Sequence, residues 1–279
     1  MSAEALIQKR PAVRMKASLR LIPGPSSESP PPAALKILRL EKSFSVNDKV
    51  LTVLKDISFT AAAGEMICIL GPSGCGKSTL LKILSGFLPP DAGSVILNGK
   101  PVTKPGPDRC VVFQEEALFP WLTVAENIAF GLKGGFRGRK RAREEVDRFL
   151  ELVGLAPFRD YRPSAISGGM KQRVALARVL ILKPKVLLMD EPFAALDAQA
   201  REEMQRLLLD LWKTFSHTIL FVTHDVSEAV TLADRILVMG KTPGCIQAEI
   251  RVNLSRPRRR EDSDFHHFCR RLYERLRRP

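Results

Sequence analysis

The stretch "GPSGCGKST", Gly71–Thr79, decides the fold prediction. It fits the pattern G-x-x-x-x-G-K-[ST] and stands between an apolar run at 65–71 and a helical pattern at 77–87. Glycines allow successive backbone N–H groups to face one anion, while a lysine and a hydroxyl serve the phosphates and Mg²⁺. The sequence therefore predicts a nucleoside triphosphate site formed by Gly71, Pro72, Ser73, Gly74, Cys75, Gly76, Lys77, Ser78 and Thr79.

Short apolar segments alternate with helical patterns in the second half of the chain. We predict strands in KVLLMD, HTILFVT and RILVM, with helices at 198–215 and 226–233 between them. Apolar strands that alternate with helices are typical of a parallel sheet covered on both faces. Further strands are predicted at 35–46, 50–61 and 94–102, and further helices at 124–132, 141–153 and from 170 onward. The sequence thus predicts an α/β fold.

The two ends of the chain differ in composition from its middle. Residues 1–34 contain PGPSSESPPPAA and show little periodicity, so we expect a disordered Pro-rich leader and no secretory signal. A main domain is expected at 35–255. Residues 256–279 are basic, and within them 264–278 form an amphipathic helix with one apolar stripe of Phe265, Phe268, Leu272 and Leu276.

The charge is strongly positive and uneven. The net charge is +14, and residues 251–279 hold ten arginines against four acids. Such patches fit nucleic acid, an anionic membrane surface, or simply solvated helix faces. No apolar run approaches the roughly 18 residues of a membrane span. Five cysteines without CxxC spacing, one of them in the apolar run at 65–71, favour a reducing compartment.

Polar residues at the ends of predicted strands supply the hydrolytic groups. Asp190 and Glu191 follow an apolar strand, where a parallel sheet binds its ligands, so Asp190 is expected to hold Mg²⁺ and Glu191 to polarise a water. His224 ends the next strand, and Gln114, after CVVF, is placed to reach Mg²⁺ or the water. Taken singly, each has a simpler interpretation as a surface-turn or packing residue.

A second helix start also fits an anion. "ISGGMKQRVALARVL", Ile166–Leu180, opens a helix with a hydroxyl and two glycines, which offers bare backbone N–H groups and the positive end of the helix dipole. The simpler interpretation is an N-cap serine, Ser167, followed by a loose turn. The residues alone leave both open.

These motifs in this order resemble the ATP-binding subunit of an ABC transporter. The resemblance rests on GPSGCGKST, Gln114, SGGMKQR, LLMDEP, ALD and THD, and covers about residues 35–260. It implies a P-loop (RecA-like) parallel-sheet core, an antiparallel β subdomain and an α-helical subdomain inserted at about 115–180. It also implies ATP hydrolysis, with ATP and Mg²⁺ as cofactors.

The resemblance assigns roles to the matching positions. Phe44 matches the aromatic residue that stacks on adenine, and Gln114 matches a residue near the metal and the attacking water. Asp190 matches the metal-side acid, Glu191 the general base and His224 the residue that contacts the γ-phosphate. Two copies are expected to pair head to tail, with Asp197 at the seam. Completion of the partner's ATP site is expected from Ser167, Gly168 and Gly169.

A narrower likeness concerns the importer subunits of the nitrate/sulfonate/taurine group. It rests on FQEEALFPWLTVAENIAFGL, DEPFAALDA and FVTHDVSEAVTLADRILVM. It implies a transmembrane permease partner, an extracytoplasmic solute-binding protein acting indirectly, and a peripheral place on the cytoplasmic face of the inner membrane. Glu115–Thr123, with Phe119 and Trp121, is the expected permease contact, although a core position for Trp121 is also open.

The alternative function is that of a soluble ABC ATPase acting on nucleic acid or ribosomes, which the basic patches would fit. Such proteins usually carry two nucleotide domains or a long coiled-coil insertion, and this chain shows one domain. The importer interpretation is therefore preferred, and no nucleic-acid partner is expected. The solute stays open among nitrate, sulfonates, taurine and related small molecules.

Overall fold

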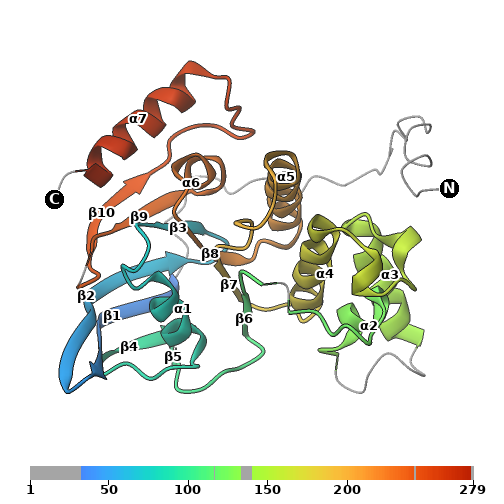
Figure 1. Ribbon diagram of the computed structural model, residues 1–279, viewed down its shortest axis with the longest axis horizontal. Coiled ribbons are helices and arrows are strands. Elements are labelled where there is room, and N and C mark those ends of the chain that lie inside the picture. Colours follow the sequence, from blue (N-terminus) through green and yellow to red (C-terminus); the bar gives the residue numbers. More distant parts are fainter. Residues whose placement is uncertain (1–32, 116, 133–139, 242, 278–279) are drawn as a thin grey trace. The chain divides into compact units, whose positions relative to one another are not determined.

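The computed structural model describes residues 33–115, 117–132, 140–241 and 243–277 (Figure 1). The predicted leader, 1–34, lies outside the described residues except for Ala33 and Ala34, which begin strand β1. Its disorder therefore stays a prediction. Residues 133–139, in the middle of a basic stretch, lie outside them as well.

The apolar run before the P-loop forms β3 (Met66–Leu70) inside a six-stranded sheet of order β10-β9-β3-β8-β7-β6. All neighbours in this sheet are parallel except the edge pair β10 and β9. Side chains of β3 alternate between two cores and are fully buried on both faces, as the sequence predicts. The other strands are β6 (Arg109–Val112), β7 (Val186–Asp190), β8 (Thr218–Thr223), β9 (Arg235–Met239) and β10 (Ile246–Arg251).

A second, antiparallel sheet has the order β2-β1-β4-β5. Its strands are β1 (Ala33–Val46), β2 (Lys49–Ala62), β4 (Ala92–Leu97) and β5 (Lys100–Pro101). Helix α1 (Lys77–Ser85) shares one core with both sheets, through Leu80, Leu81, Ile83 and Leu84. This packing fixes the P-loop, which joins β3 to α1, against the antiparallel sheet.

The helical part predicted at about 115–180 contains α2 (Val124–Ala129), α3 (Lys140–Leu152) and α4 (Gly168–Leu180). Short 3-10 turns lie at Ala156–Phe158 and Pro163–Ala165. With α5 (Ala198–Phe215) and α6 (Val226–Leu232), these helices share the core on the other face of the parallel sheet. In Figure 1, α2, α3 and α4 stand together on the side of the sheet away from α1. The fold is therefore the predicted α/β arrangement.

The C-terminal segment, defined here as residues 256–277, ends in α7 (Ser263–Arg277). Phe265, Phe268 and Leu272 of its stripe are buried in the core shared with α6, so the helix packs on its own chain. Before it, Arg256 pairs with Asp234 at 2.5 Å, and its guanidinium carbon lies 4.6 Å from the centre of the Trp212 ring.

Arg258 belongs to the same segment and caps α6. Its Nη1 donates to the carbonyls of Val230 at 2.7 Å and Ala233 at 2.6 Å, and burial lowers its pKa to about 10. Guanidinium groups at the end of a helix satisfy carbonyls that have no partner within it. Part of the basic C-terminal patch thus has a structural role.

Two strands are absent from the sequence prediction. β6 has only four residues, and β10 alternates polar and apolar residues at the sheet edge. Neither gives the long apolar pattern that marks the central strands. Among the described residues, no helix is both long and apolar enough to cross a membrane. All five cysteines are free thiols.

Candidate active site

The P-loop runs from the end of β3 to the start of α1 and depends on glycine at three places. Gly74 and Gly76 have φ of 81° and 97°, which side-chain-bearing residues rarely adopt. A Cβ on Gly71 would lie 2.8 Å from the carbonyl of Met239. Gly76 is also the N-cap of α1 and gives the helix no side-chain cap. The loop therefore directs backbone donors toward one space, which is the geometry of a phosphate cradle.

Lys77 folds back over this loop. Its Nζ donates to the carbonyls of Gly71 and Pro72, both at 2.9 Å, and the side chain is 5% exposed. The same Nζ lies 3.6 Å from Oε1 of Glu191. The only lysine of the motif is thus held between the loop and the acid that follows β7.

Two polar groups meet at the carboxyl ends of the parallel strands. Ser78 Oγ donates to Oδ1 of Asp190, the last residue of β7, at 3.1 Å. Burial raises the pKa of Asp190, and the hydrogen bond from Ser78 opposes that shift. A hydroxyl beside a carboxylate is the oxygen donor set that Mg²⁺ accepts when phosphates supply further ligands. These residues therefore fit the expected metal.

Glu191 has an unusual backbone conformation. Its φ is 44°, in the left-handed region, and its N–H donates to the carbonyl of Val222 in β8 at 3.1 Å. Its Oε2 lies 2.8 Å from Nδ1 of His224, the residue after β8. Strained backbone of this kind persists where the surroundings fix it, and it clusters at functional sites. Here the turn aims the carboxylate between the lysine and the histidine.

Behind His224 lies a buried polar network that the sequence did not reveal. Thr223 Oγ1 donates to Oε2 of Glu228 at 2.6 Å, and Gln205 Nε2 donates to Oε1 at 3.1 Å. Burial raises the pKa of Glu228, which is 5% exposed. Arg260 of the C-terminal segment donates in turn to Oε1 of Gln205 at 3.2 Å. The network ties the strand end that carries His224 to α5, α6 and the C-terminal segment.

Two predicted site residues lie apart from this cluster. Gln114 is exposed and follows β6, which pairs in parallel with β7 (Val112 opposite Met189), so it stands at the same sheet edge as Asp190. Phe44 lies in β1 opposite Leu51 of β2, is 37% exposed, and has Lys42 Nζ 5.5 Å from its ring centre. Among the described residues no hydrogen bond or ion pair joins either side chain to the cluster, so the roles of Gln114 and Phe44 stay predictions.

The second helix start has both features that the sequence left open. Ser167 is the N-cap of α4, because its Oγ accepts from the N–H of Met170 at 3.3 Å. A Cβ on Gly168 would meet nothing within 4 Å, and one on Gly169 only Ala200 at 3.7 Å. The three residues line a pocket of about 360 Å³ with Asp197, which caps α5 through the N–H of Ala200 at 2.8 Å. No P-loop residue lines that pocket.

Comparisons with known proteins agree with this geometry. Residues 54–194 match the sequence profile described as ABC transporter. A putative ATP-binding protein of Brucella abortus is 51% identical over 205 residues, covering 74% of this chain and 79% of that protein.

The chain belongs to the ABC transporter family.

Two more relatives carry a transport name. The nitrate import ATP-binding protein NrtD of Synechococcus elongatus is 45% identical over 223 residues, covering 79% of this chain and 81% of the relative. The taurine import ATP-binding protein TauB of Burkholderia pseudomallei is 50% identical over 206 residues, covering 74% and 79%.

Solved structures of ABC cassettes share the fold. CbiO1 from Clostridium perfringens, part of an ABC transporter complex, has a TM-score of 0.70 at 30% identity, covering 79% of this chain and 89% of that one. The dimeric ATP-binding cassette MJ0796, bound to ADP and phosphate, has a TM-score of 0.68 at 29% identity, covering 79% and 100%. As an ABC-type ATPase, this chain binds ATP and hydrolyses it.

Proposed function

We propose that this chain is the ATP-hydrolysing subunit of a membrane importer for nitrate, a sulfonate, taurine or a related small solute. The observation that carries the proposal is the convergence of Lys77, Ser78, Asp190, Glu191 and His224 at the carboxyl ends of the parallel strands. The relatives named for nitrate and taurine import support the choice of an importer.

The proposed roles rest on these contacts and on the matching motifs of the family. Lys77 and the P-loop amides would bind the β- and γ-phosphates. Ser78 and Asp190 would hold Mg²⁺, with Gln114 at the same sheet edge. Mg²⁺ bound there would neutralise charge on the phosphates. Glu191 accepts a proton from a water molecule as the water oxygen attacks the γ-phosphorus. The bond between the γ-phosphorus and the β–γ bridging oxygen then breaks. ADP leaves with that oxygen. His224, hydrogen-bonded to the same carboxylate, orients it and is the proposed contact to the γ-phosphate.

A second copy of the chain completes the site in this proposal. One end of α4 carries Ser167, Gly168 and Gly169 in a pocket without P-loop residues, so its backbone donors serve a phosphate held elsewhere. The dimeric cassette MJ0796 supports pairing between two copies. Asp197 lines the same pocket and belongs to the proposed seam.

An exposed aromatic surface is the proposed permease contact. Trp121 is 67% exposed, so the interpretation of this residue as a core aromatic is wrong. Its ring centre lies 5.6 Å from that of Phe119, which lies 4.2 Å from that of the exposed Phe130. Exposed aromatics in one group mark protein interfaces more often than open surface. Through this surface the subunit would sit on the cytoplasmic face of the inner membrane.

The predicted extracytoplasmic solute-binding protein would act through the permease. The alternative is an ATPase acting on nucleic acid or ribosomes. It was suggested by the basic patches, and part of the basic C-terminal segment has partners within the chain. There Arg256 pairs with Asp234, and Arg258 donates to carbonyls at the end of α6.

Co-purification tests the importer proposal. The tagged chain is extracted from membranes in mild detergent, and the variant Trp121→Asp serves as a matched probe of the docking surface. A polytopic membrane partner that copurifies with the natural chain and is lost with Trp121→Asp is the expected result, with soluble ATPase activity unchanged. Bound RNA or DNA that survives high salt, with no membrane partner, would overturn the proposal.

A further inference from the structure

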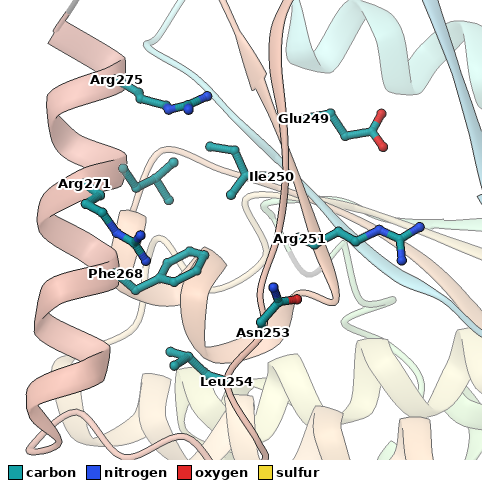
Figure 2. Close-up of a pocket in the computed structure, with 9 residues that line it drawn as sticks. Glu249, Ile250, Arg251, Asn253, Leu254, Phe268, Arg271 and Arg275 are labelled. Carbon is teal, nitrogen blue, oxygen red and sulfur yellow. The ribbon is translucent and has the colours of Figure 1, made fainter.

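A groove of about 440 Å³ lies between β10 and α7 (Figure 2), and no P-loop residue lines it. Its floor is apolar and consists of Ile250, Leu254, Phe268 and Leu272, of which Phe268 and Leu272 are buried. Small-molecule sites in proteins have this size and combine an apolar lining with a few placed polar groups.

Alternation along β10 decides which side chains face the groove. Ile250 is half-buried and points toward α7 (Figure 2). Glu249 and Arg251 also line the groove, but both are exposed and their charged groups point to the other side of the strand (Figure 2). Glu249 is also engaged, since its Oε1 lies 2.8 Å from Nη1 of Arg235. The carboxylate of Glu249 is therefore paired with Arg235 and points away from α7.

The rim on the helix side carries two arginines one turn apart. Arg271 and Arg275 are exposed, and the guanidinium of Arg275 reaches toward β10 while that of Arg271 lies 5.4 Å from the centre of the Phe268 ring. Within the described residues, neither forms an ion pair, in contrast to Arg256 and Arg260 in the same segment. Like charges at positions i and i+4 repel, so an anion between them would stabilise the pair.

From this arrangement we propose that the groove binds a small organic anion. The sulfonate, carboxylate or phosphate group of this anion accepts charge-assisted hydrogen bonds from the guanidinium groups of Arg271 and Arg275. The apolar part of the same molecule packs against Phe268, Leu272 and Ile250. The headgroup of an anionic lipid carries the same charged chemistry, and the experiment separates the two sources. The site is independent of the proposed import function.

Calorimetric titration of the full chain tests the groove with three probes: benzenesulfonate, inorganic phosphate, and phosphatidylglycerol vesicles beside phosphatidylcholine vesicles. The variant Arg271→Gln/Arg275→Gln removes both rim charges. The control Arg259→Gln/Arg270→Gln removes the same charge from exposed positions that do not line the groove. Thermal midpoints and basal ATPase rates of both variants are expected to match the natural chain, which keeps the result separate from the catalytic site.

Saturable binding of benzenesulfonate that weakens at least about tenfold in the rim variant, and less than about threefold in the control, supports a soluble organic anion. Binding of phosphatidylglycerol vesicles alone, lost only in the rim variant, supports the lipid headgroup as the source. Equal weakening in both variants means that general positive charge is responsible and overturns the proposal. Absence of binding to every probe overturns it as well.

Discussion

Nδ1 of His224 lies 2.8 Å from Oε2 of Glu191, although 33 residues separate the two in sequence. The contact exists because β7 and β8 are adjacent parallel strands that end at the same edge. The other carboxylate oxygen, Oε1, lies 3.6 Å from Lys77. Glu191 therefore sits between the phosphate-binding lysine and the histidine.

Glu191→Gln is expected to lower the ATPase rate by about 10²–10⁴, because the amide cannot accept the proton of the attacking water. Nucleotide affinity stays, since the P-loop and Lys77 are unchanged. His224→Ala is expected to lower the ATPase rate by about tenfold to a hundredfold, the usual effect of losing a hydrogen bond to a charged group. Steady-state hydrolysis and nucleotide titration measure both. Retention of the full rate in Glu191→Gln would remove its role as general base.

Mixed dimers test whether Ser167 serves the partner's ATP. When one chain carries Lys77→Ala and the other Ser167→Arg, one composite site receives both lesions and the other receives none. One occupied site per dimer is expected when ATP is trapped in these mixtures. Homodimers of chains that carry both substitutions are expected to trap none. Occupancy that follows each chain independently of its partner would contradict the proposed pairing.

Glu228 predicts a pH dependence of stability. Burial raises its pKa in the folded chain above the unfolded value. Its contribution to folding is thus full below the unfolded pKa and declines as the pH rises through the folded one. The side chain in the Glu228→Gln variant cannot ionise. The free energy of unfolding of this variant, relative to that of the natural chain, should therefore increase as the pH rises from 5 to 8.

Urea midpoints at pH 5 and pH 8 measure this difference, with Glu274→Gln, at an exposed position of α7, as the control variant. A difference between the natural chain and Glu228→Gln that is the same at both pH values would refute the argument from burial.

The apolar stripe of α7 predicts a matched pair of stability effects. Phe268 is 9% exposed in the core, whereas Tyr273 of the same helix is 48% exposed. Phe268→Asp is expected to cost about 1.5–3 kcal/mol or more, because apolar burial is lost and a charge must be hydrated. Tyr273→Asp should change the free energy of unfolding by less than about 0.5 kcal/mol. Equal effects in thermal unfolding would show that the helix does not pack as described.

Local pattern allowed most of the fold to be predicted. The helix at 198–215 and the strand RILVM have the predicted bounds, because Asp197 caps a helix with periodic apolar residues and the strand is almost entirely apolar. The strand RCVV is too short for a pattern of its own, and the alternation of IQAEIR gives little signal at a sheet edge. The P-loop motif likewise pointed to Lys77 and Ser78, and the end of a predicted strand pointed to Asp190; Ser78 and Asp190 meet because the P-loop follows a strand of the same parallel sheet.

Contacts between elements that lie far apart in the chain could not be predicted from the sequence. Glu228 and Gln205 are 23 residues apart on different helices, and only their shared burial shows that they pair. The exposure of Trp121 depends on how α2 and the segment before it pack, which periodicity does not report. Arginine counts likewise gave no distinction between Arg258, engaged with carbonyls, and the arginines that face solvent.

The chain has only two tryptophans, and their surroundings are opposite. Trp121 stands in water on the aromatic surface, whereas Trp212 is half-buried, donates from Nε1 to the carbonyl of Gly64 at 3.0 Å, and lies beneath Arg256. Intrinsic fluorescence therefore carries two separable signals. A Trp212→Phe chain emits only from the surface proposed to meet the permease, and a Trp121→Phe chain emits only from the place where the C-terminal segment is anchored. Docking at the aromatic surface and detachment of the C-terminal segment can therefore each be followed by tryptophan fluorescence, without an added label.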